Sequence, residues 1–521
     1  MPCLPLPTEL WLAILEPLAR EIITAKRSSR FLRPGYGALA SVCRHWQLIF
    51  EPRIFEHLTL RVADVQCLNL AVRERRRHLV KHIWFIVEFP MYSCYDYELD
   101  RQAPLDNVPS DCFWNGISCL FRELSMWGAP YARGDTGITL ELSMWSPSDN
   151  MYSFQDIDFG EGDCLDPFPD VEEDFQRHAS FLHAPYHGWV QGSRFRSATT
   201  MEWQRIRHFI HLREEDDMDM PSVVAVTSLL LRRQTRADLH KSAYEAICAR
   251  LPNLAQVHLE MWQEWEEPRI KDKTRDLRCM LETAFPRSIE RVTLLYDTSE
   301  AIRGEYQHDI TVSHQKLRNE LAFQLLYFSL SLKRFTCSFV LTADEFFDHY
   351  LYSTHFYDQP LSARQARMSS KIKWPYLQQI TMTSPSLQPG VPASNITQLV
   401  YSAGLAALDM LHMRKFQLWH VGNDHASLLS FEHALGETSW SWETDLDNVE
   451  PFPYVPINPW LEFNTDVLYC EEPIRYKTTS IDKNRIKCRA DAIYFLGLGP
   501  EVVRPISLHQ MRREGRTYAN V

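Results

Sequence analysis

The sequence predicts an α/β protein with three parts. These are a small N-terminal helical domain, an irregular solenoid of helices and mainly parallel strands, and an antiparallel C-terminal cap. Three observations support this prediction. Apolar residues recur at helical spacing in the first sixty residues, an apolar-x-x-apolar-x-apolar pattern returns along the body of the chain, and two alternating runs follow near its end.

Length and composition indicate a multi-part globular protein. The chain has 521 residues, of which 45% are hydrophobic and 23% charged, and its net charge is −12. This acidic balance disfavours nucleic-acid binding, and no apolar run is long enough for a membrane helix or resembles a signal peptide. Twelve scattered cysteines are typical of reduced thiols in a cytoplasmic or nuclear protein. We therefore expect protein partners, with no nucleic acid and no membrane.

The first part, residues 1–60, contains two apolar helical faces. One face comprises Leu10, Ile14 and Leu18, and the other comprises Leu39, Val42, Trp46 and Ile49. Pro17 and Pro52 are expected to end the two helices. Because so short a segment buries little apolar surface by itself, we expect another protein to complete part of this surface.

Both halves of this first part resemble an F-box. The opening half is LPTELWLAIL, and the closing half is SVCRHWQLIFEPRIFEHLTL, which ends in a short helix in that family. The resemblance implies a helical domain that docks on the Skp adaptor of a cullin–RING ubiquitin ligase. The positions that match imply adaptor contact or its direct support by Leu6, Pro7, Leu10, Ile14, Leu15, Val42, Cys43, Trp46 and Ile49.

The whole chain also resembles a group of fungal F-box proteins of uncharacterised function. This wider resemblance includes the segment RRRHLVKHIWFIVEFPMYSC and the aromatic C-terminal part. It implies no catalytic residue and names no substrate.

The body of the chain, residues 61–424, repeats one apolar spacing. The pattern is present at Val80/Ile83/Phe85, Leu254/Val257/Leu259, Ile289/Val292/Leu294, Leu332/Phe335/Cys337, Leu377/Ile380/Met382 and Met413/Phe416/Leu418. Several copies follow an amphipathic helix, and this order predicts a degenerate leucine-rich-repeat-like solenoid with parallel strands. The alternative is a doubly wound sheet, but no glycine-rich phosphate loop follows any expected strand.

The chemistry-bearing residues do not indicate an enzyme. Five histidines (His178, His183, His187, His208, His211) lie near an acidic insertion at about 150–220, but Pro185 breaks the helix that would align two of them. The acidic run lacks the register of a calcium loop. No nucleophile elbow, P-loop, kinase or metalloprotease signature occurs. We expect no catalytic residue, no cofactor and no metal.

Two short stretches refine the structural prediction. The pentapeptide ELSMW occurs twice, at Glu123–Trp127 and at Glu141–Trp145. The first copy should close a helix, and the second should lie in a strand, because their flanks have different periods. In the last part, residues 425–521, alternation predicts an antiparallel hairpin over Leu428–Glu443 that caps the sheet, followed by a tail.

The sequence therefore leads to one functional hypothesis and one alternative. In the first, the chain is the substrate-recognition subunit of a Skp–cullin–F-box ubiquitin ligase and holds an unknown protein substrate on its solenoid. In the second, it is a non-ligase interaction scaffold whose F-box-like segment only caps the solenoid. Neither hypothesis assigns catalysis to the chain.

Overall fold

A computed structural model of the chain provides the structure. It describes residues 36–93, 108–129, 137–157, 182–196, 198–212, 220–264, 267–297, 312–355, 372–422, 425–445, 458–470 and 472–518. The amino-terminal half of the F-box-like segment therefore lies outside the described residues, as do His178 and most of the acidic run.

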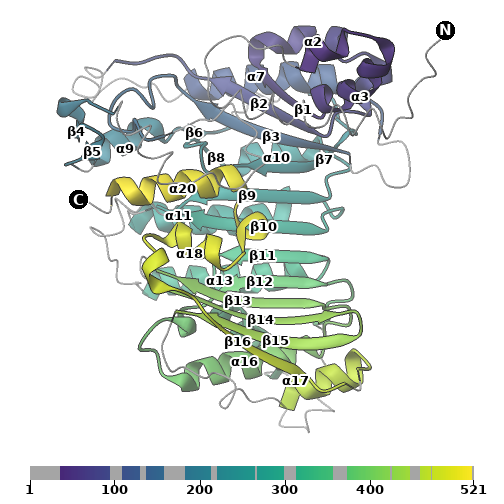
Figure 1. Cartoon of the computed structure of the whole chain (residues 1–521), viewed down its shortest axis with the longest axis vertical. Coiled ribbons are helices and arrows are strands. Elements are labelled where there is room, and N and C mark those ends of the chain that lie inside the picture. The colour runs from purple at the N-terminus through teal and green to yellow at the C-terminus, as the bar shows by residue number, and fades with distance from the viewer. Residues whose placement is uncertain are drawn as a thin grey trace, which may run out of the picture.

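The described chain forms a mixed α/β fold around a sheet of twelve strands (Figure 1). Spatial order follows sequence order: β1 (His57–Arg61), β2 (His82–Glu88), β3 (Ile138–Trp145), β7 (Val226–Leu231), β9 (Gln256–Trp262), β10 (Arg291–Asp297), β11 (Arg334–Ser338), β12 (Gln379–Thr383), β13 (Lys415–Val421), β14 (Ala426–Ala434), β15 (Glu437–Thr444) and β16 (Arg475–Ser480). Strands β1 to β13 pair in parallel, β14 and β15 are antiparallel, and β16 pairs in parallel with β15.

The repeated apolar spacing predicts the strands correctly. Its last two positions lie within β2, β9, β10, β11, β12 and β13, and all eighteen residues of the six copies belong to one buried cluster. Since alternate side chains of a strand point to opposite faces, these positions share one face of the sheet. Helices cover that face: α7 (Val108–Leu124), α10 (Lys241–Ala249), α11 (Glu267–Cys279), the π-turn η4 (Met280–Ala284), α13 (Val312–Ser329), α14 (Ala343–His355), α16 (Ala393–Ala407) and α17 (Asn458–Glu462).

The opposite face of the sheet, which we call the second face, is covered in part by the C-terminal helices. These are α18 (Arg489–Phe495), α19 (Gly499–Val502) and α20 (Pro505–Tyr518). Leu294 belongs to the main cluster, but its neighbour Leu295 packs with Ile493 and Leu508 in a separate cluster. Figure 1 shows these helices lying near the centre of the sheet, although they end the chain.

The prediction of a leucine-rich-repeat-like solenoid is wrong. The described residues form one large, mostly parallel sheet and contain no stack of similar repeats. Connections differ too much for a regular repeat: β2 ends at Glu88 and β3 begins at Ile138, but β9 ends at Trp262 and β10 begins at Arg291. The C-terminal helices also break any repeat symmetry, because they cover only the middle of the second face.

At the N-terminal end, helices α2 (Tyr36–Ala40) and α3 (Arg44–Phe55) precede the sheet. Helix α3 continues through Pro52 for one more turn, although Pro52 was expected to end it. The short closing helix expected after it is replaced by strand β1, which pairs along β2. Position 60, the expected domain boundary, therefore falls inside a strand.

At the other end, the predicted antiparallel hairpin is confirmed by β14 and β15. Its tryptophans, Trp440 and Trp442, are buried, whereas Ser439, Ser441 and Glu443 between them are half-buried. Strand β16 adds a further, largely exposed strand outside the hairpin, which the sequence did not predict. The cap is therefore three strands wide.

Both predictions for ELSMW are confirmed. The first copy begins in the last turn of α7, which ends at Leu124, and the second copy lies in β3. The insertion between β3 and β7 contains the short pieces η2 (Pro185–His187), β4 (Trp189–Val190), β5 (Ser193–Arg194), α9 (Thr200–Ile206) and β6 (Phe209–Ile210). No helix of the described chain has the length and apolar character needed to cross a membrane.

Candidate functional site

The residues expected to contact an adaptor fall into two groups. Leu6, Pro7, Leu10, Ile14 and Leu15 lie outside the described residues. Of the other four, Val42 and Cys43 lie in the turn between α2 and α3, and Trp46 and Ile49 lie in α3.

Within this second group the structure separates two environments. Trp46 and Ile49 are half-buried and pack with Leu39 around Phe50, and the ring centroids of Trp46 and Phe50 are 6.0 Å apart. Val42 is 61% exposed and Cys43 is also exposed. The expected helical face is therefore half supporting core and half open surface.

Leu48 is a further exposed apolar residue of this helix pair, and the sequence analysis missed it. It is 67% exposed although it is a large apolar residue in the middle of α3. We call Val42, Cys43 and Leu48 the α2–α3 surface. The sequence signal for Leu48 was an apolar residue that lies off the helical face formed by Trp46 and Ile49. Helical periodicity alone does not indicate what such a residue contacts.

Helix α3 is fixed to the rest of the molecule at its C-terminal end. Arg76 donates to the Glu51 carboxylate, with 2.9 Å between Nε and Oε1, and its guanidinium lies 4.9 Å from the Phe55 ring centre. Burial tends to raise the pKa of Glu51, but hydrogen bonds from Arg76 and Gln47 lower it overall. The Glu56 carbonyl accepts from the amides of residues 81 and 82 at 3.0 and 2.9 Å. The α2–α3 surface is thus held on the sheet edge.

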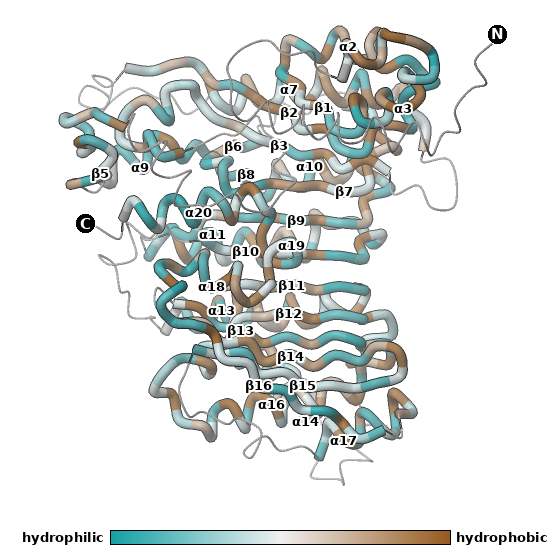
Figure 2. The backbone as a smooth tube through the Cα atoms, viewed as in Figure 1, coloured by the Kyte–Doolittle hydropathy of each residue, from teal (hydrophilic) through white to brown (hydrophobic). Residues whose placement is uncertain are grey.

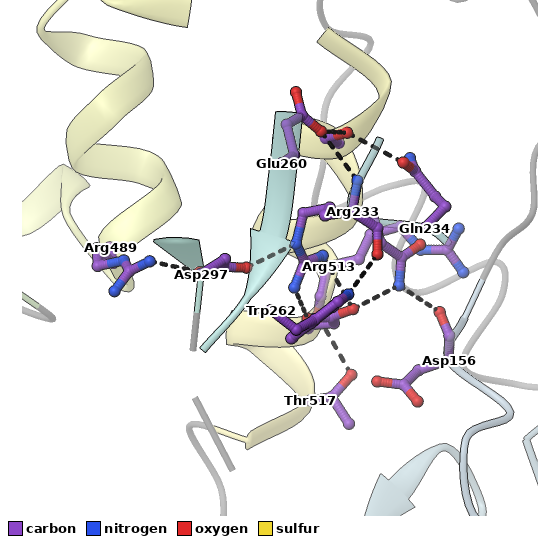
Figure 3. Close-up of polar contacts among 12 residues, drawn as sticks. Asp156, Arg233, Gln234, Glu260, Trp262, Asp297, Arg489, Arg513 and Thr517 are labelled. Carbon is purple, nitrogen blue, oxygen red and sulfur yellow. Dashed lines mark hydrogen bonds and ion pairs between the residues drawn. The ribbon is translucent and has the colours of Figure 1, made fainter. Parts of the chain in front are cut away.

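A second candidate site, which is polar, lies on the second face beneath α20 (Figure 3). Arg233, just after β7, donates to Asp297 at the end of β10 (2.6 Å) and to Glu514 of α20 (2.8 Å). Arg489 of α18 pairs with the other Asp297 oxygen. We call these side chains, with Arg236, the buried ion network; all are almost completely inaccessible to water.

Electrostatics explain how these charges remain ionised. Burial alone would raise the pKa of Glu514, but the facing guanidinium groups of Arg233 and Arg236 lower it to about 2. Arg233 is also buried, but Glu514 and Asp297 raise its pKa. Its guanidinium carbon lies 4.4 Å from the centre of the Trp262 ring. Each charge therefore has a fixed partner of opposite sign, as buried ions require.

Glu260 of β9 extends the same contacts to α20. One oxygen accepts from the Arg233 amide at 3.0 Å, and the other lies 3.0 Å from His258 Nε2. The Ser507 hydroxyl and the Arg504 amide also donate to this carboxylate. Burial would raise the pKa of Glu260, but these partners lower it. The carboxylates are fully engaged, so this arrangement holds α20 and offers no free acid or base.

The histidines of the insertion do not converge. His183 Nδ1 accepts from the Gln191 amide at 3.3 Å, and His187 lies 4.0 Å from Glu202. His208 packs edge-on against Phe89, and the tilted rings of His211 and His240 lie 4.8 Å apart between centroids. Within the described ranges, no three His, Cys, Asp or Glu side chains are grouped so that they could hold a metal ion.

Comparison with known proteins adds one match. The model of a family of unknown function, DUF6546, matches residues 284–504. This segment begins at the end of η4, includes β10 to β16 and α18, and ends just before α20. No curated protein matches the chain.

Proposed function

We propose that the chain is the substrate-recognition subunit of a Skp–cullin–F-box type ubiquitin ligase. Residues 1–60 would form an F-box-like helical domain that binds the Skp adaptor, and the sheet domain would hold a protein substrate. The chain itself would catalyse nothing. The observation that carries this proposal is the α2–α3 surface, which lies in the segment that resembles an F-box.

The burial pattern supports docking at this place. Trp46 and Ile49 brace the helix pair from inside, while Val42 and Leu48 present large apolar side chains to water. Burying one such side chain against a partner contributes roughly 1.5–3 kcal/mol. The sheet core does not use these residues, because the cluster around Phe50 is separate from the main one.

The test is co-purification with a Skp adaptor. The double variant Val42→Asp/Leu48→Asp should fold normally, since both side chains are exposed, and should lose the adaptor. Leu435→Asp is the matched control: Leu435 is fully exposed in the β14–β15 turn, far from the F-box-like segment, and its variant should bind as wild type. Unchanged adaptor binding by the double variant would contradict the proposal.

Trp46→Ala gives a second, internal test. Removal of this half-buried ring from so small a cluster should cost up to roughly 3–5 kcal/mol and unfold the helix pair. Adaptor binding should disappear while the sheet retains its cooperative melting transition. Co-purification of this variant at the wild-type level would contradict an F-box reading of the segment.

The alternative function is a non-ligase interaction scaffold. One observation favours it: α3 leads directly into β1, the edge strand, so the segment covers an end of the sheet. A chain that starts at Glu56 keeps β1 and separates the two functions. The ligase proposal expects it to remain folded and monomeric without adaptor binding, whereas the scaffold alternative expects it to aggregate.

A further inference from the structure

A cavity of about 420 Å³ lies at one end of the sheet, between the start of α10 and the side of α11. Its base is formed where β9 and β10 end, at Met261 and Tyr296. The two-residue strand β8 (Asp238–Leu239) lies beside it. Ligands of open α/β sheets bind outside the carboxyl ends of the strands, and this cavity has that position.

Apolar side chains contribute a large part of the cavity surface, beside charged residues and two histidines. The apolar side chains are Phe209, Leu239, Tyr244, Met261, Leu277 and Met280. Two of them are methionines, whose flexible thioether side chains adapt to the shape of a ligand. Cavities that bind small molecules are mainly apolar and have volumes of roughly 300–1,000 Å³, so both the size and the lining of this one fit such a ligand.

The charges at the cavity neutralise one another. Lys273 Nζ lies 3.0 Å from both oxygens of Asp238, and Arg207 lies 2.9 Å from Asp238 and 2.7 Å from Glu264. The other charged side chains that line the cavity are Lys241, Arg269, Arg275, Asp272 and Asp276, so four basic and four acidic side chains line it in all. A charged ligand would add an unpaired charge to this buried region, which is costly, whereas a neutral ligand adds none.

One hydroxyl group at the cavity lacks a partner. The Tyr296 hydroxyl is buried and makes no hydrogen bond to any described residue. Burial and the nearby Asp238 carboxylate keep its pKa well above the ordinary value, so the phenol stays protonated and can donate. Since buried donors are nearly always bonded, a ligand oxygen would satisfy this one.

We propose that this cavity binds a neutral, mainly apolar small molecule with one hydrogen-bond acceptor, which accepts a hydrogen bond from the Tyr296 hydroxyl. The cavity lies between α10, α11 and the sheet and shares no residue with the α2–α3 surface. The proposal therefore does not depend on adaptor binding, and the tests of the two are separate.

The first experiment titrates the full-length chain with N-phenyl-1-naphthylamine, a neutral dye that fluoresces in apolar sites. Leu277→Trp places a larger ring in the cavity, whereas Leu281→Trp is a matched control in the next turn, since Leu281 does not line it. Both leucines are 3% exposed. Leu277→Trp should keep the wild-type melting temperature and weaken dye binding by at least about tenfold. Leu281→Trp should lower the melting temperature, because it overpacks a filled core.

The second experiment tests the acceptor. 2-Acetylnaphthalene, which has a carbonyl oxygen, should displace the dye from wild type, and Tyr296→Phe should weaken this displacement by roughly 2–12-fold, as the loss of one hydrogen bond does. Displacement by naphthalene should not change. Three results would overturn the proposal: no dye binding to wild type, wild-type dye affinity in a stable Leu277→Trp variant, or equal destabilisation by both tryptophans. An unchanged response of Tyr296→Phe to 2-acetylnaphthalene would overturn the assigned role of the hydroxyl.

Discussion

At the scale of single residues, two buried tyrosines differ in the hydrogen bonding of their hydroxyl groups. Tyr350 donates to Asp409 at 2.7 Å, whereas the Tyr296 hydroxyl has no partner among the described residues. In the ligand-free protein, Tyr296→Phe should therefore raise the free energy of unfolding by about 1 kcal/mol, and Tyr350→Phe should lower it by about 1–3 kcal/mol. Urea unfolding measures both. A loss of stability in Tyr296→Phe would show that this hydroxyl is bonded.

Two other buried groups have opposite pH dependence. Burial raises the pKa of Asp149 from 3.8 to about 7, although the Ser146 amide and the Tyr92 hydroxyl donate to it. Burial, with nearby Arg205, lowers the pKa of His208 from 6.5 to about 4. The folded state therefore keeps a proton on Asp149 that the unfolded chain releases. In contrast, His208 stays unprotonated in the folded state at pH values where it binds a proton in the unfolded chain.

The signs follow from this difference in bound protons. The Asp149 contribution makes the protein less stable as pH rises from about 4 to about 7, and the His208 contribution makes it less stable as pH falls from about 6.5 to about 4. Melting temperatures measured between pH 4.5 and 7.5 should show both trends. Relative to wild type, Asp149→Asn should gain stability as pH rises, and His208→Asn should gain it as pH falls. Parallel curves for the variants and wild type would contradict these assignments.

The residue scale also shows why the candidate site was only partly predicted. Periodicity placed Val42, Trp46 and Ile49 on one helical face, and the structure has Trp46 and Ile49 inside and Val42 outside. A helical repeat identifies apolar positions, but it does not say which protein buries them. The unpaired Tyr296 hydroxyl has no local sequence signature, because its environment comes from several elements distant in the chain.

At the scale of elements, α20 is an amphipathic helix that is anchored by charges as well as apolar contacts. Figure 2 shows it as largely hydrophilic, and its Glu514 pairs with Arg233 and Arg236 on the second face. Glu514→Gln removes the counter-ion that Arg233 and Arg236 share, leaving Arg233 with Asp297 alone, and should cost about 3–5 kcal/mol. Glu437→Gln breaks the exposed Arg475 pair and should cost less than about 1 kcal/mol. Equal effects in urea unfolding would contradict a special role for the buried ion network.

The elements that were predicted correctly from the sequence can each be recognised from their own residues and neighbouring segments. A strand such as β9 or β12 is recognisable because its own residues alternate and a helix precedes or follows it. Helices α18 to α20 could not be assigned to the second face in this way. Their partners, such as Asp297 for Arg489, lie 192 residues away, and no local period encodes such a pairing.

At the scale of the whole molecule, the last hundred residues protect both an edge and a face. A chain that ends at Val421 loses β14 to β16 and the C-terminal helices, so β13 becomes an open edge and Trp419 is uncovered. We expect this chain to be insoluble. A chain that ends at Arg504 loses only α20 and should be less stable but monomeric in size-exclusion chromatography, because the sheet edge remains capped. A monomeric chain ending at Val421 with the wild-type melting temperature would show that the cap assignment is wrong.

The separation between Arg233 and Glu514 also has a consequence for biosynthesis. These partners are 281 residues apart, so at typical elongation rates the ribosome needs on the order of 15–60 s to supply the second after the first. Until then, Arg233, Glu260 and Asp297 of the nascent chain lack their partners in α18 and α20. Strands β7 to β10 can pair during translation, but their buried charges are covered only after α20 has been synthesised.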